Sequence, residues 1–297
     1  MTQSQRLKKP EWLKIKMPSG KNYLKIKNHK DQLHLNTVCQ EANCPNLGEC
    51  WNSGTASFML MGDTCTRACR FCAVNTSRSP SPLNPEEPKK MAETLKSLHL
   101  KYIVLTTVDR DDLPDLGAGH ITACVQEVLK ELPNLLVEIL IPDFQGKTDL
   151  LDIVAKSGAV VVSHNLETTR KFSPIVRDRR ANYDQSLKVL DYVKSSYPHL
   201  YTKSSLMLGF GETSEEVIES MKDLRDIDTD FLTLGQYLQP TKNKLPVVEY
   251  IHPDQFDHYR EIGLKMGFDY VASGPLVRSS YQAAEHYLKS KLKKPKK

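Results

Sequence analysis

Six of the seven cysteines in this 297-residue chain fall into two groups of three. Cys65, Cys69 and Cys72 stand in the string CTRACRFC, directly after the apolar run Ser57–Met61. Three thiolates on one short loop can hold three irons of a 4Fe–4S cluster and leave the fourth iron open to an external ligand. A structural zinc site takes four protein ligands, commonly from paired C-x2-C knuckles, and no further Cys or His lies near this loop. The spacing therefore favours an iron–sulfur cluster over zinc.

A second triplet precedes the first. Cys39, Cys44 and Cys50 stand in CQEANCPNLGECW with C-x4-C-x5-C spacing, and this string also lacks a fourth cysteine. A second cluster here must take a ligand from a distant part of the chain. Cys124 is not a candidate, because it lies on the apolar face of the helical pattern Ile121–Leu132 and is interpreted as a core thiol.

Apolar runs alternate with helical patterns from residue 56 onward. The strand candidates are Ser57–Met61, Tyr102–Thr106, Leu135–Ile141, Ala159–Ser163, Ser204–Leu208, Phe231–Leu234 and a weaker Tyr270–Ala272. Continuous apolar runs of this kind are typical of parallel strands buried on both faces. Six or seven strands fall short of eight, so we expect an α/β fold of the incomplete (β/α)6 TIM-barrel type. The pattern alone also fits a flat doubly wound sheet.

The two ends of the chain do not follow the strand–helix rhythm. Residues 1–55 predict an irregular N-terminal extension that carries the second triplet, residues 56–272 the barrel, and residues 273–297 a C-terminal extension with a lysine-rich tail. The net charge of +5 divides into +8 for residues 1–30, +6 for residues 286–297 and −9 between them. Neither basic end interleaves aromatic residues as a stacking platform would, so no nucleic-acid partner is expected.

Composition also bears on the compartment. No run of eighteen apolar residues is present, so no membrane span is predicted. The N-terminus has no apolar signal segment, and clustered cysteines without one indicate a reducing compartment. We therefore expect a cytoplasmic protein.

The motifs resemble a known family. CTRACRFC resembles the signature of radical S-adenosylmethionine (SAM) enzymes, in which the open iron binds the amino and carboxylate groups of SAM. Together with CQEANCPNLGECW, TTVDRDDLPDLGA, VEILIPDFQG, SHNLET and the terminal GPLVRSSY, it makes the chain similar to lipoyl synthases from about residue 9 to residue 287. The pairing of two triplets with RSSY is highly specific to that family.

The resemblance implies a sulfurtransferase of protein lipoylation. Lipoyl synthases insert two sulfur atoms, at C6 and C8, into an octanoyl chain on a lysine of a carrier domain, either the glycine-cleavage H protein or a dehydrogenase E2 subunit. A cluster on Cys65, Cys69 and Cys72 would reduce SAM to a 5′-deoxyadenosyl radical, with electrons from a flavodoxin or ferredoxin. Such a radical is needed because an unactivated methylene offers ordinary catalysis no acid, base or electrophile.

The second cluster would be the sulfur donor. The resemblance places it on Cys39, Cys44 and Cys50, with Ser280, the second serine of RSSY, as the fourth ligand. From the residues alone, Ser279 and Ser280 fit better as N-caps of a helix YQAAEHYLKS.

Predicted contacts to SAM lie at later strand ends. The candidates are Asp109, Glu138, His164, Asn165, Gly209 and Gly211. Without the family, a DRDD run is a solvated turn, a lone histidine is a satisfied polar residue, and the glycines form a tight turn. Ser205, Met207 and Lys244 depart from the residues usual in the family at their positions.

Two other functions are compatible with parts of the sequence. One is a radical SAM enzyme that thiolates RNA, with the lysine tails on phosphates. The other is a non-enzymatic, zinc-stabilised scaffold that binds an acidic partner. Lipoyl carrier domains are typically acidic, so the basic ends of this chain could also steer such a domain to the barrel.

Overall fold

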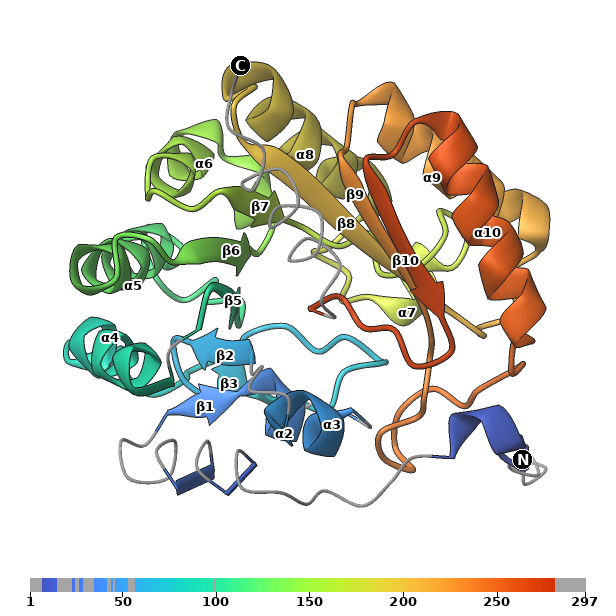
Figure 1. Ribbon diagram of the computed structural model, residues 1–297, viewed down its shortest axis with the longest axis horizontal. Coiled ribbons are helices and arrows are strands. Elements are labelled where there is room, and N and C mark those ends of the chain that lie inside the picture. Colours follow the sequence, from blue (N-terminus) through green and yellow to red (C-terminus); the bar gives the residue numbers. More distant parts are fainter. Residues whose placement is uncertain are drawn as a thin grey trace.

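The computed structural model describes residues 7–14, 23–24, 27–28, 35–41, 44, 46–52, 57–98 and 100–280. Its main sheet has eight strands in the order β1-β2-β5-β6-β7-β8-β9-β10 and curves into an open barrel (Figure 1). The strands are β1 (Asn36–Thr37), β2 (Ser57–Leu60), β5 (Tyr102–Thr107), β6 (Leu136–Leu140), β7 (Val161–Ser163), β8 (Tyr201–Leu208), β9 (Phe231–Gln236) and β10 (Tyr270–Gly274). All seven predicted strands are present, and the incomplete barrel is confirmed.

One strand of the main sheet was not predicted. The short β1 pairs antiparallel with β2, whereas every other neighbouring pair in the sheet is parallel. It belongs to the N-terminal extension, which therefore adds to the edge of the barrel sheet. Two residues are too few for a hydrophobic period, so the sequence carries no signal for this strand.

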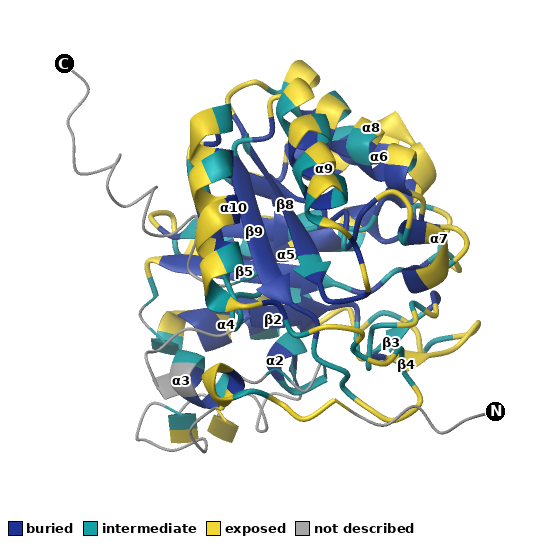
Figure 2. Ribbon diagram, turned by 90° about the vertical axis from the view of Figure 1, so that its right-hand side faces the viewer, coloured by how far each residue is buried: buried dark blue, intermediate teal, exposed yellow. Residues whose placement is uncertain are grey.

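Helices cover the outer face of the sheet (Figures 1 and 2). The longer ones are α4 (Glu87–Leu98), α5 (Ala118–Glu131), α6 (Thr148–Ala155), α8 (Tyr183–Ser196), α9 (Ser214–Asp226) and α10 (Pro253–Met266). Short elements are α2 (Val38–Glu41), α3 (Leu47–Asn52), α7 (Ser173–Val176), the 3-10 turns η1 (Glu11–Leu13) and η2 (Phe144–Gly146), and a small parallel pair of β3 (Thr64–Cys65) and β4 (Asn75–Thr76). No helix of the described chain is long and apolar enough to cross a membrane.

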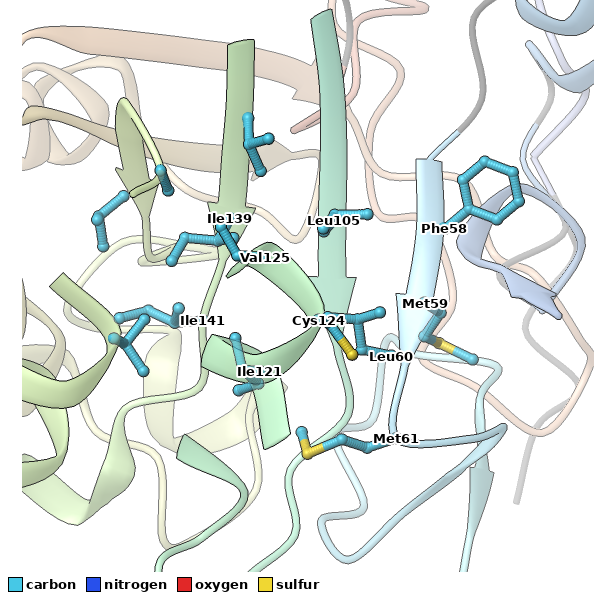
Figure 3. Close-up of a cluster of buried hydrophobic side chains, with 14 of the residues drawn as sticks. Phe58, Met59, Leu60, Met61, Leu105, Ile121, Cys124, Val125, Ile139 and Ile141 are labelled. Atoms are coloured by element: carbon cyan, nitrogen blue, oxygen red, sulfur yellow. The ribbon is translucent and has the colours of Figure 1, made fainter. Parts of the chain in front are cut away.

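The apolar core lies between the sheet and these helices. Figure 3 shows its part around β2, β5, β6 and α5, where Phe58, Leu60, Leu105 and Ile139 are buried. Cys124 of α5 is fully buried in this cluster, and burial raises the pKa of its thiol well above the usual range. The prediction of a core thiol is confirmed.

The N-terminal extension shares this core. Leu35, Cys39 and Trp51 are buried in the same cluster as the β2 and β5 side chains. The described residues between 35 and 52 therefore pack against the barrel and bring the second cysteine triplet next to it.

Candidate functional site

A cavity of about 310 Å³ opens at the carboxyl ends of the parallel strands, where barrel active sites are found. All three thiols of CTRACRFC line it, and so do Cys39 and Cys44 of the other triplet. Cys50 is not among the lining residues but packs against the same core from α3. The structure thus brings both triplets to one cavity.

Backbone donors surround the first triplet. The N–H groups of Arg67 and Asp109 donate to Cys65 Sγ at 3.4 and 3.3 Å, and the N–H of Asp178 donates to Cys69 Sγ at 3.3 Å. Such donors favour a thiolate, which is the form that ligates iron. Burial nevertheless raises the pKa of Cys65 and of Cys69 to about 12, and also raises that of Cys72. Metal binding must therefore displace protons from these thiols.

An arginine inside the triplet fastens this loop to the barrel. The Arg67 guanidinium is 3% exposed and pairs with Asp143 at 2.7 Å, Asp111 at 2.9 Å and Asp109 at 3.2 Å. These carboxylates follow β5 and β6, so one side chain joins the cysteine loop to two strand ends. Burial by itself would raise the pKa of Asp143. The hydrogen bonds and the charge of Arg67 outweigh this effect, so the pKa of Asp143 is lowered.

Asp109, a predicted SAM contact, lines the cavity beside the thiols. Its carboxylate lies 3.7 Å from Cys65 Sγ. Burial raises the pKa of Asp109 to about 6, and the Arg67 charge opposes this rise.

His164 and Asn165 also line the cavity, just after β7. His164 is held by Ile141 O at Nδ1 and by Ser186 Oγ at Nε2, both at 2.9 Å. Burial lowers its pKa to about 4, so the imidazole is neutral near pH 7 and forms part of the wall. The Asn165 side chain donates to Glu167 Oε1 at 3.0 Å, while its Oδ1 is buried with no partner among the described residues.

Glu167 and Arg177 were not predicted but line the same cavity. Burial raises the pKa of Glu167. Arg177 is buried, and its Nη1 donates to Ser186 Oγ at 2.8 Å. No ion pair of Arg177 occurs within the part of the chain described. Glu167 belongs to the SHNLET string and could have been noticed there, whereas no sequence signal marks Arg177.

Three predicted SAM contacts, Glu138, Gly209 and Gly211, are not among the residues that line the cavity, and their contact with SAM stays a prediction. Glu138 precedes the end of β6 by two residues, and its carboxylate accepts bonds from Lys203 Nζ at 2.6 Å and Ser163 Oγ at 2.7 Å inside the barrel. Gly209 has φ of +116°, and a Cβ there would lie 2.6 Å from the Glu249 carbonyl oxygen. These glycines form a tight turn within the chain.

The second triplet lies beside the C-terminal segment. Cys44 N donates to Cys39 O at 2.9 Å, and burial raises the pKa of Cys39 to about 11. Burial lowers the pKa of Arg278, while the charge of the neighbouring Cys44 thiolate acts in the opposite direction. Ser279 and Ser280 line the cavity with these cysteines.

A side-chain bond ties the two ends together, from Asn46 Nδ2 to Leu276 O. Ser280 is thus placed near the second triplet, and its role as a ligand stays a prediction. The predicted helix YQAAEHYLKS and the lysine tail lie outside the described residues.

Comparison with known proteins decides the family. Residues 59–224 match the model of the radical SAM superfamily, and residues 1–44 match that of the N-terminal domain of lipoyl synthase. The chain is 55% identical over 290 residues to the mitochondrial lipoyl synthase of Schizosaccharomyces pombe, covering 96% of this chain and 78% of that protein. It is 54% identical over 294 residues to the one of Branchiostoma floridae, covering 97% and 78%. The chain belongs to the lipoyl synthase family.

Solved structures support the fold. Methylornithine synthase aligns with a TM-score of 0.55 at 18% identity, covering 77% of this chain and 74% of that one. The FeFe-hydrogenase maturase HydG from Carboxydothermus hydrogenoformans aligns with a TM-score of 0.52 at 11% identity, covering 91% and 70%.

The comparisons overturn the expected compartment. Relatives at this level of identity are named as mitochondrial lipoyl synthases, and that of Plasmodium knowlesi, 53% identical over 283 residues covering 95% of this chain and 64% of that protein, as an apicoplast one. These names point to an organelle, so the prediction of a cytoplasmic protein is wrong. It relied on the absence of an apolar signal segment, which says nothing of organelle import.

Lipoyl synthases are sulfur-inserting enzymes that use SAM and two 4Fe–4S clusters. The residues of this structure fit those groups. The cavity has thiols of both triplets on its walls, the unpartnered Asn165 Oδ1 needs a donor, and Arg177 offers a buried positive charge without an ion pair in the described chain. Membership in the family also removes the zinc-stabilised scaffold from consideration.

Proposed function

We propose that this lipoyl synthase inserts sulfur at C6 and C8 of an octanoyl chain carried on a lysine of a lipoyl carrier domain, the glycine-cleavage H protein or a dehydrogenase E2 subunit. The main support is that thiols of both cysteine triplets, each triplet too small to close a cluster, line one cavity: all three of the first and Cys39 and Cys44 of the second. A radical source and a sulfur source within one enclosure match the needs of a substrate whose reacting carbons are an unactivated methylene at C6 and an unactivated methyl group at C8.

The triplets have different roles in this proposal. Cys65, Cys69 and Cys72 hold the cluster that binds SAM, and Cys39, Cys44 and Cys50 hold the sulfur-donating cluster together with Ser280. When bound, the first cluster and SAM supply the radical chemistry that no side chain can provide. A flavodoxin or ferredoxin supplies the electrons.

Side chains of the cavity wall bind and orient SAM. Asn165 Oδ1 accepts a donor from SAM, and Arg177 binds its carboxylate, since this guanidinium is buried and has no ion pair in the described chain. Asp109 and Glu167 are carboxylates on the same wall and receive the amino group or the hydroxyls. His164 stays neutral and holds the end of β7 in place through its two ring nitrogens.

Apolar side chains receive the octanoyl chain. Val38 and Met59 line the cavity on the side of the second triplet, and Val108, Met207 and Leu238 line it at the strand ends. These walls exclude water and bury the methylenes at about 0.8 kcal/mol each. The acyl chain therefore lies between the two triplets.

The test is an anaerobic assay of the reconstituted protein with SAM, dithionite and an octanoyl-lysine peptide. Wild type is expected to add two sulfur atoms to the peptide, as read by mass spectrometry. Cys65→Ala is expected to abolish SAM cleavage, because its cluster loses one of three protein ligands. Cys39→Ala is expected to cleave SAM but transfer no sulfur.

Cys124→Ala is the matched control, since Cys124 lies in the core away from the cavity, and it is expected to keep both activities. Loss of SAM cleavage in both Cys65→Ala and Cys39→Ala would contradict the division of roles.

A further inference from the structure

Three chain segments surround one side of the cavity opening, and we call them the mouth surface: residues 68–71, 175–180 and 240–248. Backbone bonds join them, because Arg70 N donates to Val176 O at 2.9 Å and Leu245 N donates to Arg70 O at 3.1 Å. Each segment also supplies lining residues, among them Phe71, Arg177 and Pro240. The mouth surface is thus continuous with the cavity.

The mouth surface is strongly cationic. Its six basic residues are Arg70, Arg177, Arg179, Arg180, Lys242 and Lys244, and Asp178 is the single acidic residue in the three segments. Asp178 is already engaged by Arg180 at 2.9 Å and by the N–H of Ala68. Arg70, Arg179 and Lys242 are exposed and form no ion pair within the described chain. Glu249 directly follows the third segment, and even with its negative charge included the basic residues of this surface outnumber the acidic ones.

Exposed apolar side chains lie among these cations. Ile175 is 48% exposed and Val248 is 57% exposed, and both belong to the few large hydrophobic residues that are exposed in the described chain. Apolar anchors with a charged rim are typical of protein-binding surfaces. No aromatic residue of the three segments is exposed, so the stacking platform that single-stranded RNA needs is lacking there.

We propose that the mouth surface docks an acidic face of the folded carrier domain around its octanoylated lysine. This inference rests on the proposed function. The acyl chain has to enter the cavity through its opening, so the carrier must come to lie on the surface beside it. Exposed cations without acidic partners then steer an acidic domain and fix its orientation.

The test reverses two charges on the mouth surface. In Arg179→Glu/Lys242→Glu, both side chains are exposed, and neither forms an ion pair within the described chain. With the octanoylated H protein as substrate, kcat/KM at low salt is expected to fall about tenfold or more, and the difference from wild type should shrink as salt rises. Turnover of a short octanoyl-lysine peptide should stay within about twofold of wild type, because the peptide needs only the cavity.

Lys222→Glu/Lys265→Glu is the matched control, with the same charge change on exposed positions of α9 and α10. It is expected to leave turnover of the H protein near that of wild type. An equal loss in the control, or an unchanged kcat/KM in the mouth variant, would overturn the docking proposal. The docking proposal would also be overturned if deletion of residues 289–297 alone removed the salt dependence of kcat/KM for the H protein, because the tail would then be the docking element.

Two further outcomes separate the hypotheses. Loss of transfer RNA binding in the mouth variant, with H protein turnover unchanged, would assign the surface to nucleic acid and overturn the proposal. Failure of the wild type to add sulfur even to the peptide would refute the proposed function itself, independently of docking.

Discussion

At the scale of single residues, Arg67 links the cysteine loop to the barrel. It is the second residue after Cys65, and its guanidinium binds carboxylates that follow two different strands. Removing one partner of a buried charge network leaves the others uncompensated. The position of the three thiols therefore depends on this side chain, and we propose Arg67 as a positioning residue for the first cluster.

Arg67→Gln is expected to lose the first cluster and keep the second. After anaerobic reconstitution, iron should fall from about eight to about four per chain, and SAM cleavage should fall more than about tenfold. Arg67→Lys should restore little, because an ammonium cannot bind two carboxylates in a fork. Iron content and the absorbance near 400 nm, roughly the range of iron–sulfur clusters, are the measurements.

Arg110→Gln is the control for this variant. Arg110 is also buried and pairs with Asp112 at 2.8 Å, but it makes no bond to the cysteine loop. The control should keep both clusters even if its stability drops. Equal iron loss in both variants would mean that Arg67 acts only through general stability.

At the scale of elements, four neighbouring strands are joined by polar side chains buried inside the barrel. Glu138 of β6 and Lys203 of β8 form a buried pair at 2.6 Å, with exposures of 1% and 2%. Tyr102 of β5 and Ser163 of β7 donate to the same carboxylate. One carboxylate thus joins four consecutive strands.

Lys203→Met is expected to destabilise the protein by about 3–5 kcal/mol, because Glu138 is left buried without its cation. The free energy of unfolding of the cluster-free protein in urea measures the effect. Adding Glu138→Gln to Lys203→Met should recover much of the loss, since the uncompensated charge is removed. A double variant as unstable as Lys203→Met alone would mean that packing, not charge, dominates at this place.

At the scale of the whole molecule, the two chain ends complete the site. Cys44 and Ser280 are separated by most of the sequence, yet the bond from Asn46 Nδ2 to Leu276 O holds their segments together. Positive charge is concentrated near both ends of the sequence, in Lys8 to Lys14 and in the lysine tail. The mouth surface is a further cationic area, formed by segments of the barrel that are far apart in sequence, so the distribution of charge along the chain does not reveal it. Docking of the carrier is therefore a property of the assembled opening.

Ser280→Ala tests whether the chain ends share one cluster. Iron retained after exposure to a chelator is expected to fall from about eight toward about four per chain, and sulfur transfer should be lost while SAM cleavage persists. Ser279→Ala, one residue away on the same cavity wall, should behave as wild type. If the two variants behave alike, Ser280 has no special role as a ligand.

Local spacing carried much of the prediction. The cysteines of each triplet are close in sequence, so their chemistry was visible without a fold, and continuous apolar runs were enough to predict the parallel strands. Asp109, His164 and Asn165 directly follow strands, and they line the cavity because parallel strands end at one edge.

Other features were decided only by the tertiary structure. Glu138 lies two residues before the end of its strand, and at this position its carboxylate points into the barrel. An apolar run in the sequence does not specify which side chains of a strand point inward. Arg67 takes its role from Asp143, which lies far away in sequence, and Arg177 lines the cavity with residues from distant strand ends, neither of which spacing can show. The sequence by itself thus determined the ligand types and the sheet, because both depend on neighbours along the chain. The chain fold decided which side chains share the cavity, because that depends on contacts between distant segments.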